Sequence, residues 1–323
     1  MAGRTSPDRV RTVAVVGTGV IGAGWAAHFL RTGYDVVAWD PGPGAEARLH
    51  ALVETAWPAL ERLGVAPGGG PHRLRFVGSL EEACSGAEFV QESSPEVLPA
   101  KVDLLSAIDA VTPPGVVVAS STSGFSMSQM AVDCAHPERF VVGHPFNPPY
   151  LIPLVEVVGG KATAPDLVEW ARAFYTCAGK ACLVMEHELP GFVGNRLQEA
   201  LWREALHMIG SGEATAQQID DAIVHGPGLR WAFMGPILTF HLAGGPAGMA
   251  HMLDHFGPAL LEPWTRLDAP ELTPELRDAV VAQAEGLSGG RSVADLARRR
   301  DEFLVDLLLV LERHRPLLET LDA

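Results

Sequence analysis

The sequence is poor in cysteine, and none of its four cysteines forms a C-x-x-C pair. This spacing favours reduced, partly buried thiols over a disulfide framework or a zinc site. Long hydrophobic runs are also missing: no apolar stretch approaches the roughly 20 residues that a membrane helix needs, and no apolar signal core follows the first residues. We therefore expect a cytoplasmic protein that does not act at a membrane.

Positive charge is scarce as well. The chain has 24 Lys and Arg against 39 Asp and Glu, a formal net charge of −15, and its only lysines are Lys101, Lys161 and Lys180. Nucleic-acid binding needs a basic surface that neutralises phosphates, so this composition argues against such a partner. The 323 residues, 47% hydrophobic and 20% charged, are typical of a globular protein and long enough for two domains.

A glycine-rich turn follows the first predicted strand, residues 12–17. It has the pattern G-x-G-x-x-G at the start of a helical pattern, and Asp40 ends a second predicted strand about 20 residues later. In this context the glycines let the backbone approach a pyrophosphate, which lies at the helix N-terminus. A carboxylate at Asp40 would bind the adenosine ribose and repel a 2′-phosphate, so NAD is favoured over NADP. The predicted cofactor contacts are Gly17, Thr18, Gly19, Val20, Ile21, Gly22 and Asp40.

The predicted fold class is α/β, with a Rossmann-type doubly wound sheet followed by an all-helical C-terminal domain. Apolar runs predict further strands at 75–77, 89–92, 116–120, 140–143, 153–158 and 182–185. From Gly191 onward the apolar spacing is helical, and the last long helix is expected at about 292–315 after a capping Ser292. We expect an NAD-binding domain at 1–189 and a helical substrate and dimerisation domain at 190–323.

A histidine and a carboxylate follow at the edge of the predicted nucleotide-binding domain. His144 comes directly after the 140–143 strand, and Glu156 lies on the next strand. Oxidation of an alcohol needs a group that takes the hydroxyl proton while hydride leaves the carbinol carbon. A histidine supported by a carboxylate suits this task near neutral pH, so the pair is the predicted acid/base device.

Several motifs resemble the 3-hydroxyacyl-CoA dehydrogenase family in order and spacing over essentially the whole chain. They are the glycine fingerprint, Ser120–Gly124 (SSTSG), His144–Pro149 (HPFNPP), Glu156 and Pro190–Arg196 (PGFVGNR). The resemblance implies that His144 and Glu156 are the catalytic pair, that Asn195 joins them, and that Ser123 touches substrate and cofactor. It also implies a homodimer, and it places Glu96, Lys101 and Asn147 at the nicotinamide end of NAD.

The closer likeness is to the L-carnitine dehydrogenase branch of that family, through Ala200–His207 and Gly228–Gly235. Carnitine carries a secondary alcohol between a carboxylate and a trimethylammonium group, and aromatic faces recognise such a cation. We therefore expect substrate contacts from Trp231 and Phe233, with Arg230 as a possible carboxylate clamp. Phe192 is a further predicted contact. The predicted reaction is NAD-dependent oxidation of the 3-hydroxyl of L-carnitine to 3-dehydrocarnitine.

Other interpretations stay open at this point. The same scaffold could oxidise an L-3-hydroxyacyl-CoA or L-gulonate, although residues 43–75 contain no lysine for the phosphates of CoA. A protein that binds NAD without catalysis is the non-enzymatic alternative. His251 and His255 have i, i+4 spacing that could hold a metal, but the H-E-x-x-H glutamate is missing and the chemistry needs no metal. We therefore predict no metal site.

Overall fold

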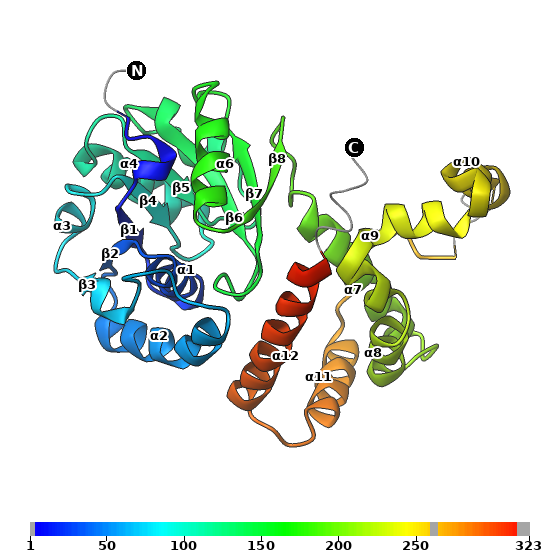
Figure 1. The fold of residues 1–323 in the computed structure, drawn as a ribbon. Helices are drawn as coiled ribbons and strands as arrows, with labels where there is room; N and C mark the ends of the chain where they lie inside the picture. The colour runs from blue at the N-terminus through cyan, green and yellow to red at the C-terminus, as the bar shows by residue number, and fades with distance from the viewer. Residues whose placement is uncertain (1–3, 259–263, 315–323) are drawn as a thin grey trace. The chain divides into compact units, whose positions relative to one another are not determined.

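The computed structural model describes residues 4–258 and 264–314 of the chain (Figure 1). The chain forms two compact units, one of Met1–Asn195 with Asp301–Leu309 and one of Arg196–Arg300 with the C-terminal residues from Val310. The two units therefore separate six residues later than the boundary expected at 189/190. One part of the last helix also belongs to the first unit, which sequence patterns did not indicate.

A single mixed sheet organises the first unit. Within the described residues it has eight strands in the order β3-β2-β1-β4-β5-β6-β7-β8. The strands are β1 (Thr12–Val16), β2 (Asp35–Trp39), β3 (Leu74–Phe76), β4 (Phe89–Glu92), β5 (Val117–Ser120), β6 (Phe140–Pro145), β7 (Leu154–Gly159) and β8 (Ala181–Met185). All neighbours pair in parallel except β6 and β7, which are antiparallel. Each strand predicted from the sequence is present within two residues of its expected bounds.

Helices cover both faces of this sheet, because successive strand residues point to opposite sides. Val13 and Val15 pack in one core cluster, and Ala14 and Val16 pack in another. The first cluster also holds residues of α1 (Val20–Arg31), α2 (Ala45–Arg62) and α6 (Leu167–Cys177), and the second holds residues of α3 (Leu80–Cys84), α4 (Leu98–Val111) and α5 (Met127–Met130). The expected doubly wound, Rossmann-type fold is confirmed.

The described residues also form short 3₁₀ turns. They are η1 (Pro7–Arg9), η2 (Pro71–Arg73), η3 (Pro137–Arg139) and η4 (Gly245–Ala247). Helix α1 begins at Val20, inside the glycine fingerprint, rather than at Trp25 where the helical pattern becomes evident. Residues 22–30 of α1 are all buried, so tertiary packing compensates for the low helix propensity of its two glycines.

The described part of the second unit is built from helices only. They are α7 (Gly194–Gly210), α8 (Ala216–Val224), α9 (Pro227–Ala243), α10 (Gly248–Phe256), α11 (Pro274–Ser288) and the parts of α12 (Val293–His314) outside 301–309. Helix α9 is interrupted at Gly235, whose φ of 69° is left-handed. The expected cap is present, since the Asp295 amide donates to Ser292 Oγ at 3.1 Å; residue 315, the expected end of α12, is outside the described part.

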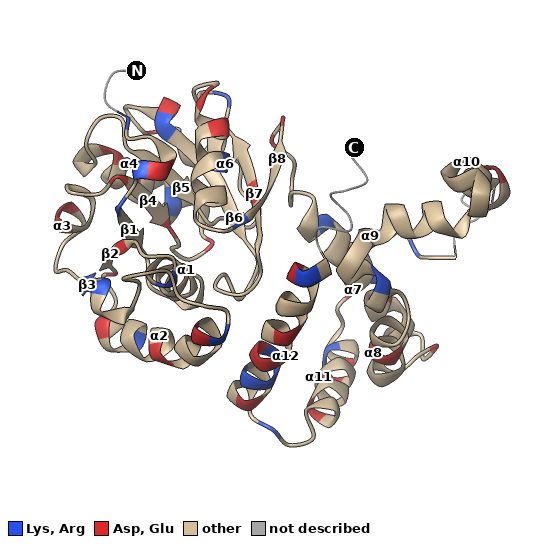
Figure 2. Cartoon of the chain, viewed as in Figure 1, with Lys and Arg blue, Asp and Glu red and all other residues tan. Residues whose placement is uncertain are grey.

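Polar contacts within the first unit hold residues 301–309 of α12 in place. Tyr150 Oη donates to Asp301 Oδ2 at 2.5 Å, and Arg62 Nη2 pairs with Asp306 Oδ1 at 2.5 Å. Figure 2 shows acidic and basic residues interspersed along α12. Among the residues described, no helix is both long and apolar enough to cross a membrane.

Candidate active site

The glycine fingerprint forms a tight turn between β1 and α1. Gly17 has a φ of 86°, and a Cβ at Gly22 would lie 1.8 Å from the Gly17 carbonyl oxygen, so neither position accepts a side chain. By contrast, a Cβ at Gly19 would meet nothing within 4 Å. The turn is therefore closely packed at Gly17 and Gly22 and open at Gly19. At this open position the N-terminus of α1 offers its amides to an anion.

Asp40 follows β2, next to this turn. Its carboxylate accepts hydrogen bonds from the amides of Thr18 and Gly42, both at 2.8 Å. Thr18 and Gly22 are buried, Ile21 is half-buried, and Gly19 and Val20 are exposed. The residues predicted to hold the adenosine and pyrophosphate of NAD are thus gathered at the carboxyl ends of β1 and β2, where open α/β sheets bind their ligands.

His144 and Glu156 face each other across the antiparallel pair of strands β6 and β7. His144 Nδ1 lies 2.8 Å from Glu156 Oε2, with the histidine 4% and the glutamate 0% exposed. The other carboxylate oxygen, Oε1, accepts from the Val193 and Gly194 amides, both at 2.9 Å. Burial alone would raise the pKa of Glu156, but the hydrogen bonds from His144, Gly194 and Val193 outweigh it and hold the pKa below its ordinary value.

Two phenylalanines pack on the imidazole of His144. The ring centroid of Phe146 lies 5.0 Å and that of Phe192 lies 5.2 Å from that of His144. Phe192, predicted as a substrate contact, is 1% exposed and has a φ of 54°. Its ring supports the orientation of the imidazole, because it belongs to the core cluster on that face of the sheet. Asn147, which follows Phe146, is exposed.

Ser123 and Asn195 come together although 72 residues separate them. Asn195 Nδ2 donates to the Ser123 carbonyl oxygen at 2.8 Å. The backbone of the same turn is fixed by Glu96, whose Oε1 accepts from Thr122 Oγ1 at 2.6 Å and from the amides of Ser123 at 2.9 Å and Gly124 at 3.1 Å. The Ser123 side chain stays exposed, so the hydroxyl is available to a ligand.

Glu92 is a residue at this site that sequence reasoning missed. It ends β4 with 0% exposure, and its carboxylate pairs with Lys101 Nζ at 3.0 Å. It also accepts from Ser120 Oγ at 2.5 Å. Lys101 is 1% exposed, and its Nζ lies 3.6 Å from Glu96 Oε2. The buried amine therefore forms an ion pair with Glu96 as well as with Glu92. The position of Glu92, at the carboxyl end of a buried strand, is the signal that could have identified it.

Arg230, Trp231 and Phe233 lie on α9 of the second unit. Arg230 is exposed, Trp231 is half-buried and Phe233 is 37% exposed. In an α-helix, residues two apart point about 200° away from each other. Trp231 and Phe233 therefore face opposite sides of α9.

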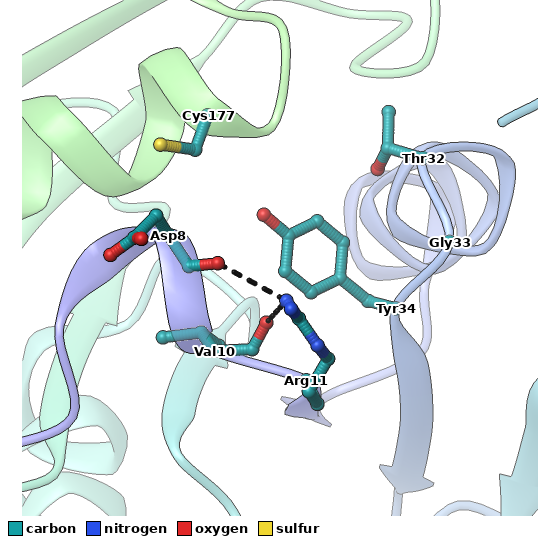
Figure 3. Close-up of a pocket in the computed structure, with 7 residues that line it drawn as sticks. All are labelled: Asp8, Val10, Arg11, Thr32, Gly33, Tyr34 and Cys177. Atoms are coloured by element: carbon teal, nitrogen blue, oxygen red, sulfur yellow. Dashed lines mark hydrogen bonds between the residues drawn. The ribbon is translucent and has the colours of Figure 1, made fainter.

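The described residues also bear on a metal site and on a cavity away from His144. Within 4–258 and 264–314, no group of three or more His, Cys, Asp or Glu side chains could hold a metal ion. A cavity of about 300 Å³ is lined by Arg11, Tyr34 and Cys177 among others (Figure 3). Arg11 and Tyr34 directly precede β1 and β2, so this cavity lies at the amino ends of the parallel strands, away from His144.

Two consecutive family models match most of the chain. One, described as the NAD binding domain of 3-hydroxyacyl-CoA dehydrogenase, matches residues 12–188, and the other, described as its C-terminal domain, matches residues 191–281. The chain belongs to the 3-hydroxyacyl-CoA dehydrogenase family. NAD is accordingly its cofactor, and the chain is an NAD-dependent dehydrogenase of a hydroxylated substrate.

Curated relatives within the 3-hydroxyacyl-CoA dehydrogenase family are similar over nearly their full length. An L-carnitine dehydrogenase of Nocardiopsis dassonvillei is 63% identical over 96% of this chain and 94% of the relative. An L-carnitine dehydrogenase of Streptomyces coelicolor is 62% identical over 97% of this chain and 98% of the relative. Among solved structures, an NAD⁺-dependent 5-formyl-3-hydroxy-2-methylpyridine 4-carboxylic acid 5-dehydrogenase has a TM-score of 0.81 at 29% identity, covering 94% of this chain and 99% of that one.

Proposed function

We propose that this member of the 3-hydroxyacyl-CoA dehydrogenase family oxidises the 3-hydroxyl group of L-carnitine to 3-dehydrocarnitine with NAD. The names of relatives at 62–63% identity support the substrate. The observation that carries the chemistry is the 2.8 Å contact between His144 Nδ1 and Glu156 Oε2, because it leaves the other ring nitrogen of His144 for the substrate.

In the proposed mechanism, His144 Nε2 is the general base. Glu156 Oε2 accepts the Nδ1 proton, which fixes the tautomer in which Nε2 has a free lone pair. Nε2 takes the hydroxyl proton of the substrate, and the carboxylate then stabilises the imidazolium. Two backbone amides hold Glu156 in place, so the base is oriented before substrate binds.

NAD, when bound, supplies the hydride acceptor of this reaction. The residues that would hold it are the fingerprint turn from Gly17 to Gly22 and Asp40, and we propose that Glu96, Lys101 and Asn147 serve its nicotinamide end. The open space above Gly19 and the carboxylate at the end of β2 fit a dinucleotide with an unphosphorylated ribose.

Ser123 and Asn195 are the proposed contacts for the substrate oxygen. The exposed Ser123 hydroxyl lies on a turn that Glu96 and Asn195 hold through backbone hydrogen bonds. Polar groups fixed in advance in this way stabilise a changing charge on oxygen without reorganising.

Arg230, Trp231 and Phe233 remain the proposed contacts of the carboxylate and trimethylammonium groups. Since Trp231 and Phe233 point to different sides of α9, we propose that only one of these two aromatics meets the cation directly. We propose that Phe192 acts indirectly, by packing against the imidazole of His144 and supporting its orientation.

A substrate panel tests this function. We expect NADH formation with L-carnitine and NAD, and little with D-carnitine, an L-3-hydroxyacyl-CoA or L-gulonate, measured by NADH absorbance in parallel reactions. Turnover of an acyl-CoA or of gulonate without turnover of L-carnitine would contradict the proposed substrate and leave the His144–Glu156 chemistry intact. Absence of NADH formation with all four substrates would contradict the substrate assignment. An NADH titration would then show whether the cofactor still binds.

We further propose that the protein is a cytoplasmic homodimer that associates through its helical unit. Large apolar side chains of α7 and α9 are strongly exposed in the single chain: Leu197 59%, Trp202 56%, Leu229 69% and Ile237 72%. Exposed apolar surface of this extent is typical of a protein interface.

Light scattering of the purified protein tests the dimer. We expect a mass near twice the 34.4 kDa of the chain, and a shift toward the mass of one chain when a charge is introduced by Trp202→Glu. The matched control is Val132→Glu, since Val132 is 67% exposed on the first unit. A wild-type mass of 34.4 kDa at assay concentration would contradict the proposal.

A further inference from the structure

Lys180 is a buried lysine to which the function described above gives no role. It follows Gly179, whose φ of 81° turns the chain at the end of α6, and it directly precedes β8. Its exposure is 5%, and a lysine is rarely buried unless its amine is bound. Burial, followed by the charge of Arg31, lowers the pKa of Lys180 to about 7.

The amine of Lys180 binds the backbone of the loop that follows the proposed base. Nζ donates to the carbonyl oxygens of Pro149 and, at 3.2 Å, of Ile152, and it lies 5.0 Å from the ring centroid of Trp25. Within the part of the chain that the structure describes, Lys180 forms no ion pair with a carboxylate. A neutral amine also has two N–H groups for two carbonyls, so these contacts survive loss of the proton.

The same loop is pressed against the cofactor helix. A Cβ at Gly24 of α1 would lie 2.7 Å from Pro149 Cδ, so helix and loop are in direct contact at this glycine. Pro149 therefore has Gly24 on one side and the Lys180 amine on another. The loop begins where β6 ends, one residue after His144, and it carries Asn147. Asn147 therefore belongs to the loop that packs on α1, the helix whose N-terminus would receive NAD.

We propose that Lys180 is a positioning residue for hydride transfer: by binding the carbonyls of Pro149 and Ile152 it holds the 146–152 loop, and with it Asn147, against α1. The kinetic part of this inference rests on the proposed function. The cofactor-binding part rests only on the NAD-binding domain. A displacement of about 1 Å between reacting groups costs on the order of 10²-fold in rate. The hydrogen bonds of Lys180 can therefore affect turnover although Lys180 does not contact the substrate.

The test compares Lys180→Met with wild type. Methionine keeps an apolar stem of similar length and removes both hydrogen bonds. We expect the Kd of NADH, from fluorescence titration, to rise about tenfold, as loss of one net hydrogen bond predicts. The kcat with L-carnitine should fall about 10- to 100-fold while KM for L-carnitine changes less than about threefold. Lys180→Arg, which retains the donors, should recover most of both losses.

The matched control is Lys161→Met, because Lys161 is an exposed lysine of the same unit. It should leave Kd, kcat and KM as in wild type. If Lys180→Met lowers only the melting temperature and keeps NADH affinity and kcat, Lys180 is merely structural and the proposal is overturned. If Lys180→Met does not fold, Lys180→Gln, whose shorter amide reaches at most one carbonyl, should show the weakened NADH binding; wild-type affinity in that variant would overturn the proposal.

Different results would contradict the proposed substrate and the proposed role of Lys180. Absence of L-carnitine turnover in wild type would contradict the proposed substrate, whereas the NADH titrations of Lys180→Met and Lys180→Arg would still decide the role of Lys180. A wild-type NADH Kd in Lys180→Met would contradict the positioning role even if L-carnitine is the substrate.

Discussion

Replacing His144 by glutamine is expected to lower kcat by about 10²- to 10⁴-fold, the usual contribution of a general base. A glutamine amide cannot take up a proton near neutral pH, and it has no second ring nitrogen through which Glu156 could stabilise a positive charge. Affinity for NADH should stay within about threefold of wild type, since His144 is proposed to act on the hydroxyl proton and not to hold the cofactor. Steady-state rates with L-carnitine and a fluorescence titration with NADH measure the two quantities.

The control for this variant is His136→Gln. His136 is an exposed histidine, paired with Glu138 at 3.4 Å, and it precedes β6 at the end opposite to His144. It should retain wild-type turnover. Turnover by His144→Gln within about tenfold of wild type would remove His144 as the base.

The Glu156→Gln variant is expected to lose about 10²- to 10³-fold in kcat, because either orientation of the new amide is wrong. If its NH₂ group faces His144, it donates to Nδ1 and forces the proton onto Nε2, which then has no lone pair for the substrate. If its oxygen faces His144, the NH₂ group meets the Val193 and Gly194 amides, and two half-buried donors lose their acceptor. This second arrangement costs about 1–3 kcal/mol per unsatisfied group.

A pH dependence of stability accompanies this substitution. The pKa of Glu156 in the folded chain lies below its ordinary value of 4.5, so the unfolded chain binds the proton first as pH falls. The ionised carboxylate therefore contributes stability above about pH 4.5, and this contribution is lost as pH falls through the folded-state pKa. Melting temperatures across the acid range should converge for wild type and Glu156→Gln.

The control is Glu169→Gln, which removes an exposed carboxylate that pairs with Arg172 on α6. It should keep wild-type kcat. An active Glu156→Gln variant with an unchanged pH profile of kcat would show that the tautomer of His144 does not depend on this carboxylate.

Much of the fold was predictable because buried parallel strands appear in the sequence as short β-branched runs. The direction of β7 was not, since the run at 153–158 has the same apolar character whichever way it points. The contribution of residues 301–309 to the first unit was also missed. It depends on contacts such as Arg62 with Asp306, which join residues too far apart in sequence for any periodicity to reveal.

The candidate site was also predictable in part from the sequence. The contact between His144 and Glu156 could be anticipated because each residue follows or lies on a predicted strand of one sheet. Glu92 was missed although it ends a predicted buried strand, where ligand-binding residues of α/β sheets gather. Lys180 could not be identified, because charged residues are usually on the surface and nothing local marks it as buried. The opposed directions of Trp231 and Phe233 follow from their place on α9, which is helical from Pro227.

The antiparallel pairing of β6 and β7 has an evolutionary consequence. His144 and Glu156 are register partners in the ladder, so their separation is set by strand pairing and not by the connection at 146–153. Insertions or deletions in that connection would leave the base and its carboxylate together while changing what surrounds them. Descendants of one ancestral enzyme could therefore acquire different alcohols as substrates by remodelling a loop, with the proton-transfer pair inherited unchanged.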